Sequence, residues 1–360
     1  MTLHSIAICA PGRIRTENQD NVYINGAFRE DIADNSVFRR GDNAPDRGLY
    51  AVADGMGGEK HGELAALIAV KELRSADVSD GCSGLAGYLA NRNADICDLM
   101  QKNDGARSGS TFAGLSVNGE NADIANIGDS RVYLLRGGAL SQISEDHTSV
   151  RQMVELGAIT KEAARSHPDR HKLTQHLGIH PHEMVIEPHT VSMQLKDGDL
   201  FLLCSDGLTE MLDDQAIEAI LSGAGKLEGR AEALYDTAMQ NGGKDNISIL
   251  LVQAETEKPA PQGAERGTAA PTQRPDRKTE RRTDNEALSL SALPGAERDA
   301  AAPTQRPDRK TELRTDYATL RLSAFTAKRR TFPYAKVILI CVAAALIVLL
   351  LFSQRLFTRI

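Results

Sequence analysis

The sequence predicts an α+β fold in which antiparallel sheets are covered on the outside by helices. Over residues 1–255 the strand-like stretches are short and follow one another in groups. Helix-like stretches with apolar residues at i, i+3 and i+4 stand between these groups. A doubly wound parallel sheet would instead need strands and helices in strict alternation, so the grouping favours antiparallel sheets with helices packed outside.

Eight strands and five helices are predicted in this region. The strands are Ser5–Ala10, Asn21–Ile24, Gly48–Asp54, Thr111–Val117, Ala122–Gly128, Arg131–Gly138, Asp199–Asp206 and Asn246–Gln253. The helices are Gly62–Arg74, Gly84–Gln101, Thr148–Leu156, Asp213–Leu221 and Leu227–Gln240.

Charge and cysteine content exclude several classes of protein. The chain has 360 residues and a formal charge of −7, but residues 1–255 alone hold 38 acidic and 23 basic residues. Such an acidic region is a poor partner for nucleic acid and a good one for divalent cations. The five cysteines show no paired spacing, which favours a reducing compartment over a disulfide framework. The first residues lack the pattern of a secretory signal.

Residues 256–333 have a different composition, rich in Pro, Arg, Thr, Asp and Ala, and contain an internal repeat. The stretch 263–293 returns as 295–325, offset by 32 residues. Two copies are too few for a solenoid, and the segment holds too little apolar surface to offset chain entropy. We expect a disordered tether, with phosphorylation at the repeated threonines as the alternative.

An uncharged apolar run follows at Val337–Phe352. With Ala335 and Lys336 it predicts a transmembrane helix over 335–352, followed by a short tail at 353–360. A buried core helix is the alternative, but no surrounding domain is predicted to bury it. Basic residues are more numerous before the run than after it, so we expect the large N-terminal part in the cytoplasm.

Five acidic residues stand at the ends of apolar stretches: Asp20, Asp54, Asp129, Asp206 and Asp245. A single aspartate beside a glycine is usually only a turn residue. Five in one acidic domain are harder to dismiss, because carboxylates brought together repel one another unless a cation neutralises them. No histidine or cysteine accompanies them, so the pattern indicates a site for Mg²⁺ or Mn²⁺ rather than for zinc.

Glycines and arginines flank these acids. Gly55, Gly57 and Gly58 follow Asp54, and glycine allows backbone conformations closed to other residues, so the Gly55 carbonyl could face a bound cation. Arg13 and Arg15 precede Asp20 in "GRIRTENQD". A guanidinium binds two phosphate oxygens at once, so arginine beside a metal cluster suggests a phosphate-containing substrate. Surface charge without function is the alternative for both arginines.

The chain resembles the bacterial PPM (type 2C) metal-dependent Ser/Thr protein phosphatases over residues 5–253. Eight blocks match in family order: "GRIRTENQD", "AVADGMGG", "SGSTFAGLSV", "ANIGDSRVYLLRGG", "SEDHTSVRQMVELGAIT", "ARSHPDRHKLTQHLG", "GDLFLLCSDGLTEML" and "GGKDNISILLV". The resemblance implies two stacked antiparallel β-sheets flanked by helices, an α-β-β-α sandwich.

The resemblance also implies a role for each acidic residue. Asp54 is expected to bridge two Mn²⁺ or Mg²⁺ ions, with the Gly55 carbonyl on one of them and Asp206 and Asp245 completing that ion's shell. Asp20 would belong to the other ion, directly or through water. Asp129 and Asp206 would form a weaker third site.

Further residues receive roles from the same resemblance. Arg15 is expected to bind the substrate phosphate, while Asn246 and Gln19 orient the residues that hold the metals. The segment Glu145–Gly178 resembles the mobile flap of bacterial members. Met56 stands where many eukaryotic relatives have a histidine that is a candidate proton donor. His147 could replace that donor, but a structural role in the flap is favoured.

The resemblance implies hydrolysis of phosphoserine and phosphothreonine by a water activated between two metal ions. Phosphorylated proteins are the expected partners, a Ser/Thr kinase of the same pathway is the expected antagonist, and the C-terminal helix is expected to hold the enzyme at the membrane. Two alternatives stay open: a catalytically inactive phosphoprotein-binding module at the membrane, and hydrolysis of another phosphate ester.

Overall fold

The computed structural model describes residues 1–56, 61–103 and 106–256, which form one α+β unit. Thirteen strands lie in this part of the chain. They are β1 (Thr2–Ala10), β2 (Asp20–Ile24), β3 (Ala27–Phe28), β4 (Phe38–Pro45), β5 (Arg47–Met56), β6 (Gly109–Ser110), β7 (Phe112–Asn118), β8 (Asn121–Ile127), β9 (Arg131–Arg136), β10 (Ala139–Gln142), β11 (His189–Gln194), β12 (Leu200–Cys204) and β13 (Ile247–Glu255).

Seven α-helices and one 3₁₀ helix accompany the strands in the described ranges. The helices are α1 (Gly62–Lys71), η1 (Glu72–Ser75), α2 (Cys82–Lys102), α3 (Ser149–Glu155), α4 (Lys161–Arg165), α5 (Asp206–Thr209), α6 (Asp214–Leu221) and α7 (Leu227–Gln240).

The strands form two antiparallel sheets. The first has the order β10-β9-β12-β13-β1-β4, and the second has the order β11-β8-β7-β5-β2-β3 with β6 pairing to the end of β5. The expectation of two antiparallel sheets is confirmed. The candidate site lies where the end of β5, the end of β12 and the start of β13 come together, since Asp54, Asp206 and Asp245 at these places line one pocket.

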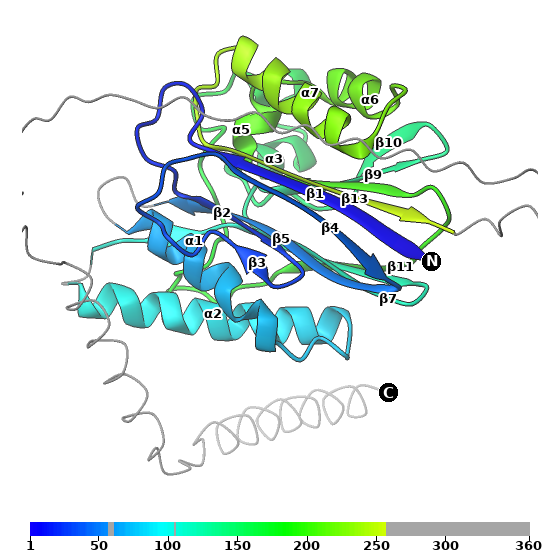
Figure 1. Cartoon of the computed structure of the whole chain (residues 1–360). Coiled ribbons are helices and arrows are strands. Elements are labelled where there is room, and N and C mark those ends of the chain that lie inside the picture. The colour runs from blue at the N-terminus through cyan, green and yellow to red at the C-terminus, as the bar shows by residue number, and fades with distance from the viewer. Residues whose placement is uncertain (57–60, 104–105, 257–360) are drawn as a thin grey trace, which may run out of the picture. The chain divides into compact units, whose positions relative to one another are not determined.

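Four layers result, with a helical layer outside each sheet (Figure 1). Apolar side chains of both sheets, such as Val52 and Leu250, meet in the central core. The outer face of the first sheet packs on α6 and α7 through residues such as Leu234. The outer face of the second sheet packs on α1 and α2 through residues such as Leu89 and Phe112. Burial on both faces explains why the central strands have few polar positions.

The eight predicted strands are present, with ends shifted by at most three residues, and the helix Leu227–Gln240 has the predicted bounds. Sequence reasoning missed β3, β4, β6, β10 and β11, and the short helices α4 and α5. Most of the strands that were not predicted lie at the edge of a sheet. Five of the eight residues in β4, which borders the first sheet, are exposed, so its sequence shows no apolar alternation.

Three predictions concern parts of the chain outside the described residues. These are the tether with its repeats, the apolar segment Val337–Phe352, and the placement of Gly57 and Gly58. Among the residues that the structure does describe, no helix is both long enough and apolar enough to cross a membrane.

Candidate metal centre

Strand pairing places two of the predicted acids directly opposite each other. In the antiparallel register of β2 and β5, Asp20 is the partner of Asp54. Opposite residues on neighbouring strands have side chains within a few ångströms, and two like charges in such a position destabilise the sheet. The pairing therefore calls for a positive charge between these strands.

The other three acids come from three different connections and converge on one pocket with Asp54. Asp206 begins α5 directly after β12, Asp245 precedes β13, and Asp129 lies in the turn between β8 and β9. All four line a pocket of about 590 Å³, together with Gly55 and Arg15. The sheet order puts β13 and β12 side by side, which explains how residues 39 positions apart reach the same site.

Asp20 lies inside the fold rather than on the pocket wall. Asp20 is only 1% exposed, and its Oδ2 accepts hydrogen bonds from Ser205 Oγ at 2.7 Å and from Ser248 Oγ at 2.8 Å. Both serines belong to the first sheet or its loops, whereas Asp20 belongs to the second. The two hydroxyls thus hold the carboxylate at the junction of the sheets.

The remaining oxygens of this cluster point to a bound cation. Asp20 Oδ1 and Asp206 Oδ1 are buried and have no hydrogen-bond partner in the described part of the chain. A buried carboxylate oxygen without a partner costs free energy comparable to a lost hydrogen bond or more. Carboxylate oxygens are the ligands that Mn²⁺ and Mg²⁺ prefer, so this donor set fits a hard divalent cation.

The electrostatics of the cluster support the same conclusion. Burial raises the pKa of Asp20 to about 7. Burial, with the charges of Asp20 and Asp206, raises the pKa of Asp54 well above its ordinary value. The pKa of Asp129 is raised in the same way by burial and by Asp206. Without a cation these three carboxyl groups therefore keep their protons to a higher pH than an ordinary aspartate does.

Arg15 reaches the pocket from the loop between β1 and β2. Its Nη2 donates to Asp245 Oδ2 at 2.8 Å, and this hydrogen bond raises the pKa of the guanidinium. The Arg15 side chain is 57% exposed, so it is free to turn toward a ligand in the pocket. A guanidinium in this place offsets carboxylate charge and presents donors to an incoming anion.

Asn246 connects the β1–β2 loop to the acid before β13. Its backbone N–H donates to Asp245 Oδ1 at 2.8 Å, and its side-chain oxygen accepts from the Gln19 backbone N–H at 2.8 Å. Its amide group donates to the carbonyls of Pro11 and Glu17. Asn246 therefore orients Asp245 and fixes the loop that carries Arg15. Gln19 takes part in this arrangement through its backbone N–H.

Gly55 is required by the close approach of two backbone segments. A Cβ at this position would lie 2.1 Å from the Gly62 carbonyl oxygen and 2.6 Å from that of Gln19. Its N–H donates to Gln19 O at 3.2 Å. Any side chain here would push apart β5 and the start of α1, and would displace Asp54 with them.

Four hydroxyl groups around the acids were not predicted. Ser205 and Ser248 bind Asp20, as described above. Thr111 Oγ1 accepts from the Asp54 backbone N–H at 3.0 Å and lies 2.6 Å from Ser130 Oγ. Because Ser130 follows Asp129, this pair connects the strand of Asp54 to the turn of Asp129. No sequence signal distinguishes these hydroxyls from ordinary surface ones.

His147, a candidate proton donor in the sequence, lies at the base of the flap segment rather than on the pocket wall. Its ring Nδ1 accepts a hydrogen bond from the Gly128 backbone N–H at 3.1 Å, and the backbone N–H of His147 donates to the Gly128 carbonyl at 2.9 Å. Burial lowers the pKa of this imidazole. These contacts join the flap to the turn that carries Asp129.

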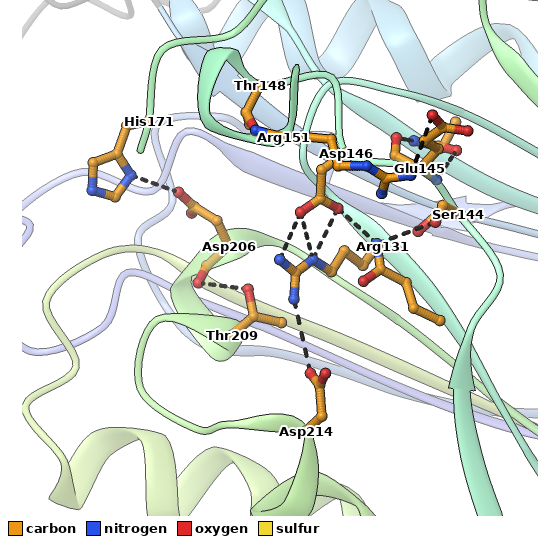
Figure 2. A network of polar contacts seen from close by, with 12 residues as sticks. Arg131, Ser144, Glu145, Asp146, Thr148, Arg151, His171, Asp206, Thr209 and Asp214 are labelled. Atoms are coloured by element: carbon orange, nitrogen blue, oxygen red, sulfur yellow. Dashed lines mark hydrogen bonds and ion pairs between the residues drawn. The ribbon is translucent and has the colours of Figure 1, made fainter. Parts of the chain in front are cut away.

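Arg131 reinforces that junction. Its guanidinium donates to both Asp146 oxygens, at 2.6 Å from Nη2 to Oδ2 and at 2.9 Å from Nε to Oδ1, and also reaches toward Asp214 (Figure 2). Asp146 is the second residue of the flap and Arg131 begins β9, so the first residues of the flap are attached to the first sheet.

His171 and Glu210 are two pocket residues that sequence reasoning missed. His171 lies in the flap, 3.7 Å from Asp206 Oδ2 through Nδ1 and 2.9 Å from Glu210 Oε1 through Nε2. The nearby Asp206 carboxylate raises the pKa of His171, and burial raises that of Glu210. Figure 2 shows the His171 ring pointing at Asp206.

Removal of the Ser205 hydroxyl tests how Asp20 is held. Ser205→Ala leaves a buried carboxylate with one donor fewer, so we expect the free energy of unfolding to fall by about 1–3 kcal/mol. Because outer hydrogen bonds tune metal ligands, Mn²⁺ affinity should fall by about 10- to 100-fold. Chemical denaturation and calorimetric titration measure the two effects. Ser141→Ala, at an exposed position of β10, is the control; equal effects in both variants would contradict this role of Ser205.

Comparison with known proteins places the chain in a family. The family model described as "Protein phosphatase 2C" matches residues 22–241. A serine/threonine phosphatase stp of Listeria monocytogenes is 33% identical over 253 residues, which are 68% of this chain and 93% of that protein. The protein phosphatase PhpP of Streptococcus pneumoniae is 33% identical over 255 residues, 68% of this chain and 95% of that protein.

Solved structures give the same answer. The Mycobacterium tuberculosis serine/threonine phosphatase PstP/Ppp has a TM-score of 0.61 and 30% identity, covering 71% of this chain and 100% of that one. A PstP catalytic domain described in complex with two manganese ions has a TM-score of 0.59 and 28% identity, again over 71% and 100% of the two chains. From the family model, the relatives and the shared fold, the chain belongs to the protein phosphatase 2C family.

Proposed function

We propose that the protein hydrolyses phosphoserine and phosphothreonine in other proteins, using two divalent cations, Mn²⁺ or Mg²⁺. The observation that carries this proposal is the convergence of four aspartates on one pocket, with the buried Asp20 opposite Asp54, two buried carboxylate oxygens that lack partners and an exposed arginine beside them. The names of the similar bacterial proteins support the choice of phosphoserine and phosphothreonine.

The position of each residue determines the role that we assign to it. Asp54, with carboxylates on both sides of it, would hold both cations; Asp206 and Asp245 would complete one shell and Asp20 the other. Asp129 would share a weaker third ion with Asp206. When bound, the cations supply an activated water and neutralise phosphate charge. The chain's own residues supply position: the hydroxyls of Ser205 and Ser248 hold Asp20, and Asn246 holds Asp245.

Met56 adds a constraint on the chemistry. It lines the pocket next to Gly55, and a thioether cannot donate a proton to the leaving serine or threonine oxygen. The proton must come from water or from another group of the pocket.

The direct test of the proposal is release of inorganic phosphate from a phosphothreonine peptide by the full chain. We expect release with Mn²⁺ or Mg²⁺ and none after chelation with EDTA, because the carboxylates cannot supply positive charge to the phosphate by themselves. Absence of metal-dependent release would contradict the enzymatic function and favour a binding module. Release from a small phosphate ester but not from the peptide would contradict the substrate class.

Replacement of Arg15 tests the phosphate-binding role. Arg15→Lys keeps the charge but loses the paired donors, so we expect kcat/KM for the peptide to fall by about 10- to 100-fold, mostly through KM. Steady-state kinetics with saturating Mn²⁺ measures the change. Arg13→Lys, two residues earlier in the same loop, is the matched control because Arg13 is held through its backbone N–H. Unchanged kinetics for Arg15→Lys would remove Arg15 from substrate binding.

We further propose that the enzyme is held at the membrane by Val337–Phe352, with its catalytic part in the cytoplasm, where it reverses the action of a Ser/Thr kinase. The uncharged run and the basic residues before it support this proposal. Deletion of Val337–Phe352 should move the protein from the membrane fraction to the soluble fraction. Deletion of the repeat 263–293 is the control and should leave it in the membrane. Undiminished membrane association of the first variant would contradict the anchor.

A further inference from the structure

Asn93 is a buried polar side chain on α2 that the proposed metal centre does not use. It is 6% exposed and lies outside the lining of the pocket that contains Asp54. Its Oδ1 accepts hydrogen bonds from the backbone N–H of Gly178 at 2.7 Å and of Ile179 at 3.1 Å, and its Nδ2 donates to the Ile179 carbonyl at 2.9 Å. Asn93 therefore joins the outer helical layer to the last residue of the flap and to the residue after it.

The amide of Asn93 is almost fully used by this contact. An asparagine amide has two acceptor lone pairs and two N–H donors, and both lone pairs and one donor of Asn93 serve the same two residues. Gly178 and Ile179 belong to no helix or strand, so their N–H groups need a partner of another kind. A buried backbone N–H without a partner costs free energy, which makes the Asn93 side chain a specific anchor for this segment.

The end of the flap also passes close to β6. Gly178 has a φ of 100°, and a Cβ at this position would lie 2.5 Å from the Ser108 carbonyl oxygen. Leu177 is fully buried, and its backbone exchanges two hydrogen bonds with Ser110, at 2.8 Å and 3.1 Å. The chain is thus fixed between α2 on one side and β6 on the other, and it can be fixed there only in one way.

The anchored segment leads directly to one wall of the pocket. His171 and Leu173, a few residues before Gly178, line the pocket. Leu173 pairs with Thr148 near the start of the flap, so both ends of the flap meet at its base. The position of the flap end therefore sets the position of the wall that His171 and Leu173 form.

The metal centre does not depend on this anchor. The Ser110 hydroxyl donates to the Asp54 carbonyl at 3.1 Å, but Asp54 has two further backbone contacts of its own. Its N–H donates to Thr111 Oγ1 at 3.0 Å, and its carbonyl accepts from the Thr111 N–H at 2.9 Å. Loss of the Asn93 contacts would thus free the flap end and leave Asp54 in place.

We propose that Asn93 is a positioning residue for peptide substrates, because it fixes the flap wall along which a phosphorylated peptide lies. Asn93 acts through Gly178 and Ile179 and does not touch the substrate. This inference rests on the proposed hydrolysis of phosphoserine and phosphothreonine. A small ester such as p-nitrophenyl phosphate occupies the phosphate site alone and does not need the wall, whereas a peptide gains orientation from it.

Steady-state kinetics of the full chain with saturating Mn²⁺ tests the proposal. In Asn93→Ala we expect KM for a phosphothreonine peptide to rise about tenfold, while kcat/KM for p-nitrophenyl phosphate and the Mn²⁺ affinity stay within about twofold of the wild type. Asn103→Ala, at the end of the same helix, is the matched control, because the Asn103 Nδ2 donates only to the Leu99 carbonyl at 3.0 Å. It should leave both substrates unaffected.

Two outcomes would overturn the proposal: an unchanged KM for the peptide in Asn93→Ala, or an equal loss of activity toward both substrates. Absence of metal-dependent release by the wild type would instead contradict the proposed function, so the two failures are distinguishable. Asn93→Asp keeps an oxygen acceptor for both N–H groups and loses the donor, so its KM should rise less. This variant carries the kinetic test if Asn93→Ala does not fold.

Hydrogen exchange in the wild type tests the anchor without any substitution. The amides of Gly178 and Ile179 should exchange about 100-fold more slowly than those of the largely exposed connection between α3 and α4, at a rate similar to the middle of α2. Exchange at Gly178 and Ile179 as fast as in that connection would show that Asn93 does not hold the flap, and would overturn the proposal.

Discussion

Asp54→Asn is expected to lower the rate of metal-dependent phosphate release by at least about 10³-fold, the largest effect of any single substitution in the site. Asp54 faces Asp20 across the strand pair, and the charges of Asp206, Asp129 and Asp245 also raise its pKa. An amide offers one neutral oxygen where two cations require charge, so both ions lose affinity at once. Phosphate release from a phosphothreonine peptide at increasing Mn²⁺ concentration measures the effect.

The control for this variant lies at the opposite end of the same strand. Asp46→Asn makes the same chemical change in the exposed turn before β5, where the residue has a φ of 45° that asparagine also tolerates. It should leave the rate unchanged. Asp54→Asn should remain folded, because it removes a charge from a cluster of like charges. Activity within tenfold of the wild type would contradict the bridging role.

The second large effect concerns the stability of the metal-free protein as a function of pH. The folded-state pKa of Asp20 is about 7, against 3.8 for an unperturbed aspartate. The unfolded chain therefore releases this proton at lower pH than the folded protein does. The contribution of Asp20 is fully present below about pH 4 and is lost as the pH rises through about 7. Over that interval the loss is on the order of 4 kcal/mol; the raised pKa values of Asp54 and Asp129 act in the same direction.

Thermal or chemical denaturation in EDTA measures this dependence. We expect the metal-free protein to be less stable at pH 8 than at pH 5, with a weaker dependence in Asp20→Asn, which has no proton to release at that position. Saturating Mn²⁺ should reverse the order, since cations bind the deprotonated carboxylates. A pH dependence of stability that is the same in the wild type and in Asp20→Asn would show that Asp20 is not the carboxyl group that causes it.

Burial explains which parts of the fold could be predicted from the sequence. Strands such as β12 and β13 lie in the middle of a sheet and are buried throughout or nearly so, so their sequences are apolar and bounded by polar turns. The strands β4 and β11 border the sheets, and their polar residues face water. Their pairing depends on a neighbouring strand that is distant in sequence, and no local pattern records it.

The acids of the site could be predicted for a related reason. Asp54 and Asp206 stand where apolar stretches end abruptly, so the sequence alone is enough to mark these two carboxylates as candidates. The groups that hold them give no such signal. Ser205 and Ser248 bind Asp20 over more than 180 positions of chain, and His171 reaches Asp206 only because the flap folds back on α5. Tertiary packing alone brings these residues together.

Diffraction from crystals of the full chain grown with Mn²⁺, recorded at the manganese absorption edge, tests the central claim most directly. We expect two anomalous peaks within coordination distance of Asp54, one also in contact with Asp206 and Asp245 and the other on the side of Asp20. Absence of any peak at Asp54 in crystals that bind Mn²⁺ elsewhere would contradict the assignment of these aspartates as a metal centre.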